Sequence, residues 1–196
     1  MYGRQHYHVV IDMLNDFISG PMTCLNAENA LNHSVNYINM HPADAVLYVC
    51  DAHPANHCSF TCNGGQWPVH CVKNTLGQEI HLAYYTRINE PSLRPHFMRI
   101  FGKGQDPDEE QYSGFNARCA DGKYLYEAIP KGMNNEDKTV VVLSGTATEY
   151  CVQATAKDLV EAGYDVQVVL EALAYVNLKD HRAAVENMKS IGIKFI

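Results

Sequence analysis

Short apolar runs alternate with segments of helical periodicity along the chain, and this alternation predicts the elements of the fold. The apolar runs predict strands at residues 8–13, 45–50, 97–101, 139–143, 165–170 and 193–196. Apolar residues at helical spacing predict helices at residues 26–40, 124–129, 148–161 and 179–190. Because buried strands alternate with amphipathic helices, the sequence predicts an α/β fold with a mainly parallel six-stranded sheet that helices cover on both faces.

The predicted elements follow one another without an internal repeat, a low-complexity segment or a Pro/Ser-rich linker. The chain has 196 residues, of which 46% are hydrophobic and 19% are charged. This composition is typical of a globular protein, and the length suits one domain with a full core. We therefore expect a single domain over residues 1–196.

Charge and hydrophobicity limit the partners to expect. A formal net charge of −7 argues against a general affinity for nucleic acid or for anionic lipid membranes. No run approaches 18 consecutive apolar residues, and the N-terminus enters a strand without a signal-peptide pattern. The seven cysteines then indicate reduced thiols in a cytoplasmic protein. We expect a small-molecule substrate and a homo-oligomer.

Chemically active side chains follow four of the predicted strands. Asp12 ends the first strand, Asp51 and His53 follow the second, Lys103 follows the third, and Cys151 comes shortly after the fourth. Ligands bind outside the carboxyl ends of the strands in open α/β sheets, and these ends share one edge of the sheet. The order of the elements therefore predicts that these side chains converge.

Cys151 lies near the start of a predicted helix. The positive end of the helix dipole and free backbone N–H groups favour a thiolate there, and they suit a developing oxyanion. Asp12 is a candidate base for the thiol proton, and Lys103 a candidate for stabilising the charged forms. The alternative interpretation is that Cys151 is a small buried hydrophobe, as free cysteines often are.

The loop after the second strand is rich in metal-ligand residues. Asp51, His53 and His57 lie in one short stretch, and His70 follows. Imidazole and carboxylate together suit zinc, manganese or iron, and so few ligands leave open positions on a catalytic or substrate-binding metal. Ordinary loop histidines are the alternative interpretation.

A second interpretation of this loop is a closed zinc module that serves structure or partner binding. Its ligands would come from Cys50, His53, His57, Cys58, Cys62, His70 and Cys71. The loop lacks a CxxC pair, and Cys50 is expected within a strand, so we favour the open site. Three aromatic residues near these groups in the sequence suit the walls of an aromatic slot, although each also suits ordinary packing: Trp67, Tyr112 and Tyr150.

Six motifs lie in order along nearly the whole chain. They are VIDMLNDF at 10–17, DAHPANHCSF at 51–60, WPVHCV at 67–72, FGKGQDP at 101–107, YSGF at 112–115 and GTATEYCV at 145–152. As a set, these motifs resemble those of the nicotinamidase (pyrazinamidase) branch of the isochorismatase-like cysteine hydrolases. The resemblance implies a three-layer α/β/α fold and the hydrolysis of nicotinamide to nicotinate and ammonia, with pyrazinamide as a further expected substrate.

The resemblance also implies how the nucleophile works. By position, the catalytic triad is Asp12, Lys103 and Cys151. The family has a cis peptide in the nucleophile turn, which falls between Thr146 and Ala147 in this chain. The backbone N–H groups of Ala147 and Cys151 then form the oxyanion hole, and the reaction passes through a thioester.

A divalent metal ion is implied as well, with zinc expected first and iron or manganese as alternatives. Its implied ligands are Asp51, His53 and His70, with His57 near or on the metal. In the family the metal is thought to hold the pyridine nitrogen of the substrate. The aromatic residues expected around the substrate ring are Phe17, Trp67, Tyr112 and Tyr150.

Two positions depart from the family pattern. The first motif commonly has glutamine where Leu14 stands, and the nucleophile turn commonly has aspartate where Glu149 stands. Neither departure removes a triad or metal position, so both bear on the substrate more than on the chemistry. The alternative function is therefore a related cysteine hydrolase that acts on a carbamoyl or ureido amide. The non-catalytic zinc module is the alternative of another class.

Overall fold

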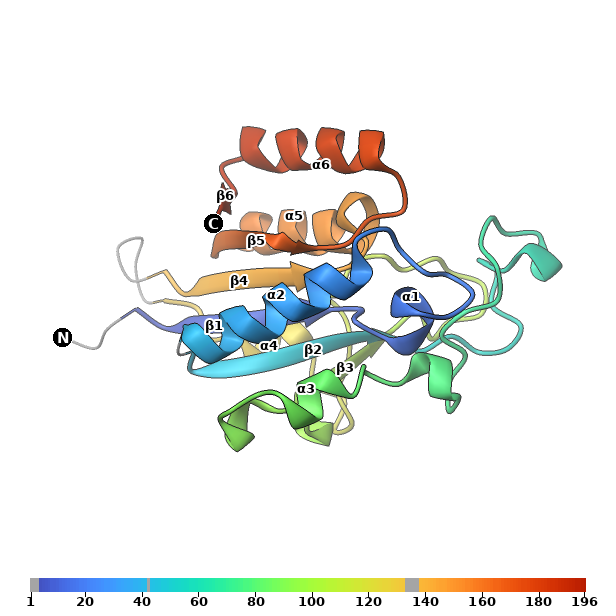
Figure 1. The fold of residues 1–196 in the computed structure, drawn as a ribbon, viewed down its shortest axis with the longest axis horizontal. Helices are drawn as coiled ribbons and strands as arrows, with labels where there is room; N and C mark the ends of the chain where they lie inside the picture. Colours follow the sequence, from blue (N-terminus) through green and yellow to red (C-terminus); the bar gives the residue numbers. More distant parts are fainter. Residues whose placement is uncertain (1–3, 42, 133–137) are drawn as a thin grey trace.

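The computed structural model describes residues 4–41, 43–132 and 138–196, and a six-stranded parallel sheet lies at its centre (Figure 1). The strands are β1 (His6–Ile11), β2 (Ala45–Asp51), β3 (Ile100–Lys103), β4 (Val140–Gly145), β5 (Asp165–Leu173) and β6 (Lys194–Phe195). Their order in the sheet is β3-β2-β1-β4-β5-β6, and all neighbouring strands run parallel. The prediction of a mainly parallel six-stranded sheet is confirmed.

Helices cover both faces of this sheet, which confirms the three-layer α/β/α fold. On one face lie α1 (Asn15–Ile18), α2 (Ala27–Met40) and α3 (Ala83–Thr86), and on the other lie α4 (Leu125–Ala128), α5 (Gln153–Glu161) and α6 (Leu178–Ser190). Short 3-10 turns occur at Thr61–Asn63, Leu76–Gln78, Pro91–Leu93 and Phe97–Arg99. A π-helical turn, Thr148–Val152, leads into α5.

The neighbouring strands β1 and β2 divide their side chains between the two cores. Val10 and Tyr48 belong to the core beneath α2, whereas Val9, Leu47 and Val49 belong to the core beneath α5. Successive side chains in a strand point to opposite faces, so a strand buried on both sides reads as a continuous apolar run. Each such side chain contributes about 1.5–3 kcal/mol by burial, which fixes the sheet that carries the site.

Several predicted elements differ from the structure in their bounds: the first strand spans His6–Ile11 instead of residues 8–13, and the fifth continues to Leu173 instead of residue 170. The third strand begins at Ile100 instead of residue 97, because Phe97–Arg99 forms a 3-10 turn. The predicted helix over residues 148–161 opens with the π turn, in which the N–H groups of both Tyr150 and Val152 donate to the carbonyl of Ala147. The bond from Val152 to Ala147 spans five residues instead of the four of an α-helix, so the turn that carries Cys151 holds one residue more than an α-helical turn.

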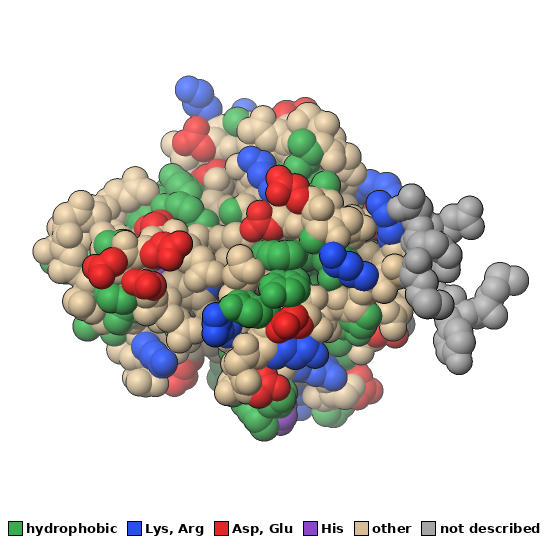
Figure 2. Space-filling model, turned by 180° about the vertical axis from the view of Figure 1, so that it is seen from behind, with side chains coloured by type: hydrophobic (Ala, Val, Ile, Leu, Met, Phe, Trp, Pro, Cys, Tyr) green, Lys and Arg blue, Asp and Glu red, His purple; other side chains and the backbone are tan. Residues whose placement is uncertain are grey.

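The surface carries charged side chains of both signs. Figure 2 shows the molecule from behind, where acidic and basic side chains are interspersed around a central group of hydrophobic side chains. The described part of this face has no continuous basic surface of the kind that binds nucleic acid, in line with the net charge of −7.

Candidate active site

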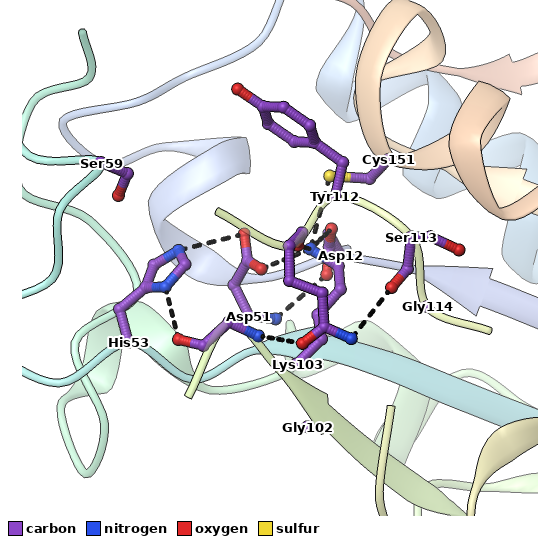
Figure 3. Close-up of polar contacts among 12 residues, drawn as sticks. Asp12, Asp51, His53, Ser59, Gly102, Lys103, Tyr112, Ser113, Gly114 and Cys151 are labelled. Atoms are coloured by element: carbon purple, nitrogen blue, oxygen red, sulfur yellow. Dashed lines mark hydrogen bonds and ion pairs between the residues drawn. The ribbon is translucent and has the colours of Figure 1, made fainter. Parts of the chain in front are cut away.

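The carboxyl ends of four neighbouring strands meet, and they bring Asp12, Asp51, Lys103 and Cys151 together as predicted (Figure 3). Asp12 directly follows β1, while Asp51 and Lys103 are the last residues of β2 and β3. Cys151 lies in the π turn after β4. Their exposed fractions are only 0%, 4%, 1% and 6%, so an acid pair, a cation and a thiol share one buried cluster.

Lys103 is the centre of this cluster. Its ammonium nitrogen lies 3.0 Å from Oδ2 of Asp12 and 3.4 Å from Sγ of Cys151, and it donates a hydrogen bond to Oδ1 of Asp51. One carboxylate oxygen each of Asp12 and Asp51 and the sulfur of Cys151 lie within 4.8 Å of one another. One buried ammonium is therefore shared by two carboxylates and a thiol, which offsets the cost of burying its charge.

The backbone at Asp12 aims its carboxylate into the cluster. Asp12 has φ of 52°, in the left-handed region that non-glycine residues rarely adopt. Its N–H donates to the carbonyl of Val49 at 2.9 Å, and its Oδ1 accepts the N–H of Asp51 at 3.0 Å. Such a conformation costs about 1–3 kcal/mol and persists where the surrounding structure enforces it, as functional sites do.

Asp12 and Cys151 hold their protons more tightly than the isolated side chains do. Burial and the charge of Asp51 raise the pKa of Asp12 to about 7, against the opposing effect of Lys103. Burial also raises the pKa of Cys151 well above its ordinary value, although Lys103 acts to lower it. Burial and the charges of Asp12 and Asp51 therefore act against the thiolate that the start of a helix favours. The thiol needs a base, and Asp12 is the base beside it.

Lys103 and Asp51 remain charged. Burial alone lowers the pKa of Lys103, but the charges of Asp12 and Asp51 reverse this and raise the pKa well above its ordinary value. Burial raises the pKa of Asp51, but Lys103 and His53 outweigh burial and hold that pKa below its ordinary value. Asp12 is thus the member of the cluster that exchanges its proton near neutral pH.

Asp51, His53 and His70 form a group that fits a divalent metal ion. One donor atom from each lies within 4.8 Å of the other two, and all three residues are buried. Nδ1 of His53 bonds the carbonyl of Gly104 at 2.9 Å, and Nδ1 of His70 bonds the carbonyl of Pro68 at 2.7 Å. These bonds leave Nε2 of both histidines for a metal, since a hydrogen bond at one ring nitrogen commonly orients the other toward the ion. Three protein ligands leave a fourth position open for substrate or water.

Gly104 is required beside this group. Its φ is 63°, and a Cβ atom there would lie 2.5 Å from Cε1 of His53. Any larger residue would displace the ring of His53, so the glycine in the FGKGQDP motif serves the metal-ligand group.

His57 is not brought into the metal-ligand group. Its Nδ1 bonds the hydroxyl of Ser59 at 2.7 Å, and its Nε2 bonds the carbonyl of Glu109 at 3.1 Å. The ring packs on that of His53 with centroids 4.1 Å apart. Both nitrogens of His57 are occupied, so its place in the structure is beside the ligands and not among them.

The closed zinc module is contradicted by the same geometry. Within the described residues, no cysteine of the 51–71 loop belongs to a group of potential ligands. Cys50 and Cys71 are instead packed in the hydrophobic core beneath α2.

A pocket of about 410 Å³, counting its open mouth, lies against Cys151 and the three potential ligands. All four predicted ring-binding residues line it: Phe17, Trp67, Tyr112 and Tyr150. Trp67 meets Tyr150 edge to face, with centroids 5.1 Å apart, and its Nε1 donates to the hydroxyl of Tyr112 at 3.2 Å. Aromatic walls with polar groups at one end suit a small planar ligand.

Sequence analysis missed several lining residues of this pocket: Met22, Cys24, Glu110, Gln111 and Val176. Val176 lies in the connection after β5, so the rule of strand carboxyl ends could have found it. Met22 and Cys24 follow α1, and no pattern in the sequence marks them.

The nucleophile turn has the predicted cis peptide between Thr146 and Ala147. Ala147 and Cys151 both line the pocket. The N–H of Ala147 makes no hydrogen bond to any described residue, so it is free to bind an oxyanion.

Comparison with known proteins shows the family of the chain. The family model for the isochorismatase domain matches residues 6–196. This chain belongs to the isochorismatase domain family. Among curated members, the nicotinamidase of Saccharomyces cerevisiae is 32% identical to the chain, and the match covers 83% of the chain and 85% of that protein.

Solved structures of family members share the fold. The pyrazinamidase of Pyrococcus horikoshii in complex with zinc is 32% identical, with a TM-score of 0.76 and coverage of 98% of both chains. The PnC1 protein of L. infantum in complex with nicotinate is 26% identical, with a TM-score of 0.80 and coverage of 98% of this chain and 92% of that one.

Proposed function

We propose that this family member is a nicotinamidase, which hydrolyses nicotinamide to nicotinate and ammonia through a thioester on Cys151. The observation that carries the proposal is the cluster of Asp12, Lys103 and Cys151, buried beside a metal-ligand group at the base of an aromatic pocket. The names of its relatives supply the substrate class. We propose pyrazinamide as a second substrate, because it presents the same carboxamide on a six-membered aromatic ring.

The proposed reaction begins with a proton transfer. Asp12 takes the proton of Cys151, and the sulfur attacks the carboxamide carbon to give a tetrahedral intermediate. The oxyanion is held by the N–H groups of Ala147 and Cys151. Asp12 then gives its proton to the amide nitrogen, the C–N bond breaks, and ammonia leaves.

Hydrolysis of the thioester reverses these roles. A water molecule gives one proton to Asp12 as its oxygen attacks the acyl carbon, the C–S bond breaks, and Asp12 returns that proton to Cys151. The product leaves as nicotinic acid, which releases the remaining proton of the water to solvent and becomes nicotinate. Lys103 stays charged throughout and stabilises the thiolate in each half-reaction. An Asp12 pKa of about 7 suits a group that must both take and give a proton near neutral pH.

The pocket orients the substrate for this attack. Phe17, Trp67, Tyr112 and Tyr150 surround the ring, and Asp51, His53 and His70 would hold a divalent metal ion, with zinc the first choice. When bound, such an ion supplies a Lewis-acid contact for a ring nitrogen.

Ammonia release from nicotinamide by the purified protein tests the proposal, measured before and after treatment with a chelator. We expect release that is lost on chelation and restored by added zinc. A folded, metal-loaded protein that releases no ammonia from nicotinamide contradicts it. Release from a carbamoyl or ureido amide would then assign the protein to the alternative function.

We further propose that residues 1–196 form one catalytic domain in a cytoplasmic homo-oligomer. The family match over residues 6–196 supports one domain, and the seven free cysteines suit a reducing compartment. In the described part of the chain, no helix has the length and hydrophobicity to span a membrane. Light scattering of the purified protein tests the oligomer, and a monomeric mass contradicts it.

A further inference from the structure

Glu149 joins the nucleophile turn to the loop between β5 and α6. It lies two residues before Cys151 in the π turn. Its Oε1 accepts the N–H of Val176 at 2.9 Å and the N–H of Asn177 at 2.7 Å. Hydrogen bonds to a carboxylate are stronger than those between neutral groups. The side chain of Glu149 therefore holds the nucleophile turn firmly to the loop at Val176 and Asn177.

The loop held in this way forms one wall of the pocket. Val176 lines the pocket together with Cys24 and Cys151. On its other side, the loop is tied to the segment after α1 by paired hydrogen bonds between Tyr175 and Leu25, of 3.1 and 2.7 Å. The loop therefore has several anchors, and Glu149 supplies the one that reaches Val176 and Asn177 from the nucleophile turn.

The link also has an electrostatic component. Asn177 is the N-cap of α6, where its side chain accepts the N–H groups of Lys179 and Asp180. The carboxylate of Glu149 thus lies at the positive end of a 13-residue helix. A negative charge there is favourable, which adds to the two hydrogen bonds.

We propose that Glu149 is a positioning residue for substrate binding, which fixes the pocket wall at Val176 relative to the thiol of Cys151. This inference rests on the proposed nicotinamidase function. The turn itself has other ties, such as the bond from the N–H of Thr148 to the carbonyl of Ala174 at 2.9 Å. That bond also holds the start of the loop, at Ala174, so loss of Glu149 should loosen the wall at Val176 and Asn177, farther along the loop, more than it displaces the nucleophile.

The kinetic test compares Glu149→Ala, Glu149→Asp and Glu149→Gln in the metal-loaded protein. We expect Glu149→Ala to raise KM for nicotinamide about tenfold and to lower kcat less than threefold, because Val176 lines the pocket and is not part of the cluster of Asp12, Lys103 and Cys151. Glu149→Gln keeps an oxygen acceptor and should restore most of the lost binding. The aspartate chain is about 1.5 Å shorter, so Glu149→Asp should lie between the two. Glu161→Ala, at the exposed end of α5, is the matched control for loss of a carboxylate.

Amide hydrogen exchange provides a readout that does not depend on activity. In Glu149→Ala, exchange at Val176 and Asn177 should accelerate at least tenfold, because both N–H groups lose their acceptor. Unchanged exchange at these amides, or a fall in kcat without a rise in KM, overturns the inference. If Glu149→Ala fails to fold, the same criteria apply to Glu149→Asp. A wild-type protein that does not hydrolyse nicotinamide refutes the proposed function, whereas the exchange measurement still tests the link.

Discussion

The ammonium of Lys103 lies 3.0 Å from Oδ2 of Asp12, and both side chains are almost completely buried. Lys103 also donates to Asp51, so one cation serves two carboxylates in the same cluster. This shared pairing leaves Asp51 charged and lets burial raise the pKa of Asp12 to about 7. An acid of that strength beside a protonated thiol is suited to carry a proton back and forth during acyl transfer.

Lys103→Met tests the shared pairing. The substitution leaves two buried carboxylates without their cation, so we expect the free energy of unfolding to fall by about 3–5 kcal/mol and amide hydrolysis to fall at least about a hundredfold. Urea unfolding and ammonia release measure the two effects. Lys179→Met, at an exposed position on α6, is the control and should change neither. A Lys103→Met protein as stable as the wild type would show that the pairing contributes little.

Cys151→Ala tests the covalent mechanism. We expect hydrolysis of nicotinamide to fall about a thousandfold or more, because the attacking sulfur is removed while the pocket walls remain. Calorimetry should still detect nicotinamide binding. Cys62→Ala removes an exposed thiol and should retain the wild-type rate. Full activity in Cys151→Ala would rule out the thioester.

His70→Ala and His57→Gln separate the metal ligands from their neighbours. We expect zinc affinity to fall at least about a hundredfold in His70→Ala, because the group of three donors loses one member. His57→Gln should retain one zinc ion per chain, since both nitrogens of His57 bond to protein groups. Elemental analysis after dialysis measures the bound metal. Loss of zinc from His57→Gln would place His57 among the ligands.

His8 predicts how stability depends on pH. Burial, with a smaller contribution from His41, lowers the pKa of His8 to about 3, and its Nε2 bonds the hydroxyl of Ser144 at 2.8 Å. The pKa in the unfolded chain is 6.5, so the unfolded state binds the proton more tightly. Stability from this group is complete above pH 6.5 and is lost as the pH falls toward 3, by about 2 kcal/mol between pH 6.5 and 5.

Urea unfolding at several pH values between 5 and 8 measures this slope. His8→Gln keeps a hydrogen-bonding group near Ser144 but cannot take up a proton, so its slope should be smaller by the contribution of His8. An identical slope in the two proteins would show that another group is responsible for the acid sensitivity.

The amino-acid pattern is enough to predict the layers of the fold and the edge of the sheet at which the active residues lie. Apolar runs alternating with amphipathic helices specify a parallel sheet, and the ends of parallel strands share one edge. That rule predicts that Asp12, Asp51, Lys103 and Cys151 lie together, as they do in the structure. Periodicity identifies these elements because a strand buried on both faces is apolar at consecutive positions, and a helix buried on one face is apolar at every third or fourth position.

Two features of the site depend on how distant segments pack: the pKa of the Cys151 thiol, and which side chains contact one another around the pocket. The raised pKa of Cys151 comes from burial against carboxylates on other strands, and no local pattern carries that information. The sequence leaves open whether His57 is a metal ligand, and in the structure Ser59 and Glu109 occupy its nitrogens. The link from Glu149 to Val176 joins segments 27 residues apart. Distances of a few ångströms between such segments, and the water they exclude, are set only when the whole chain packs.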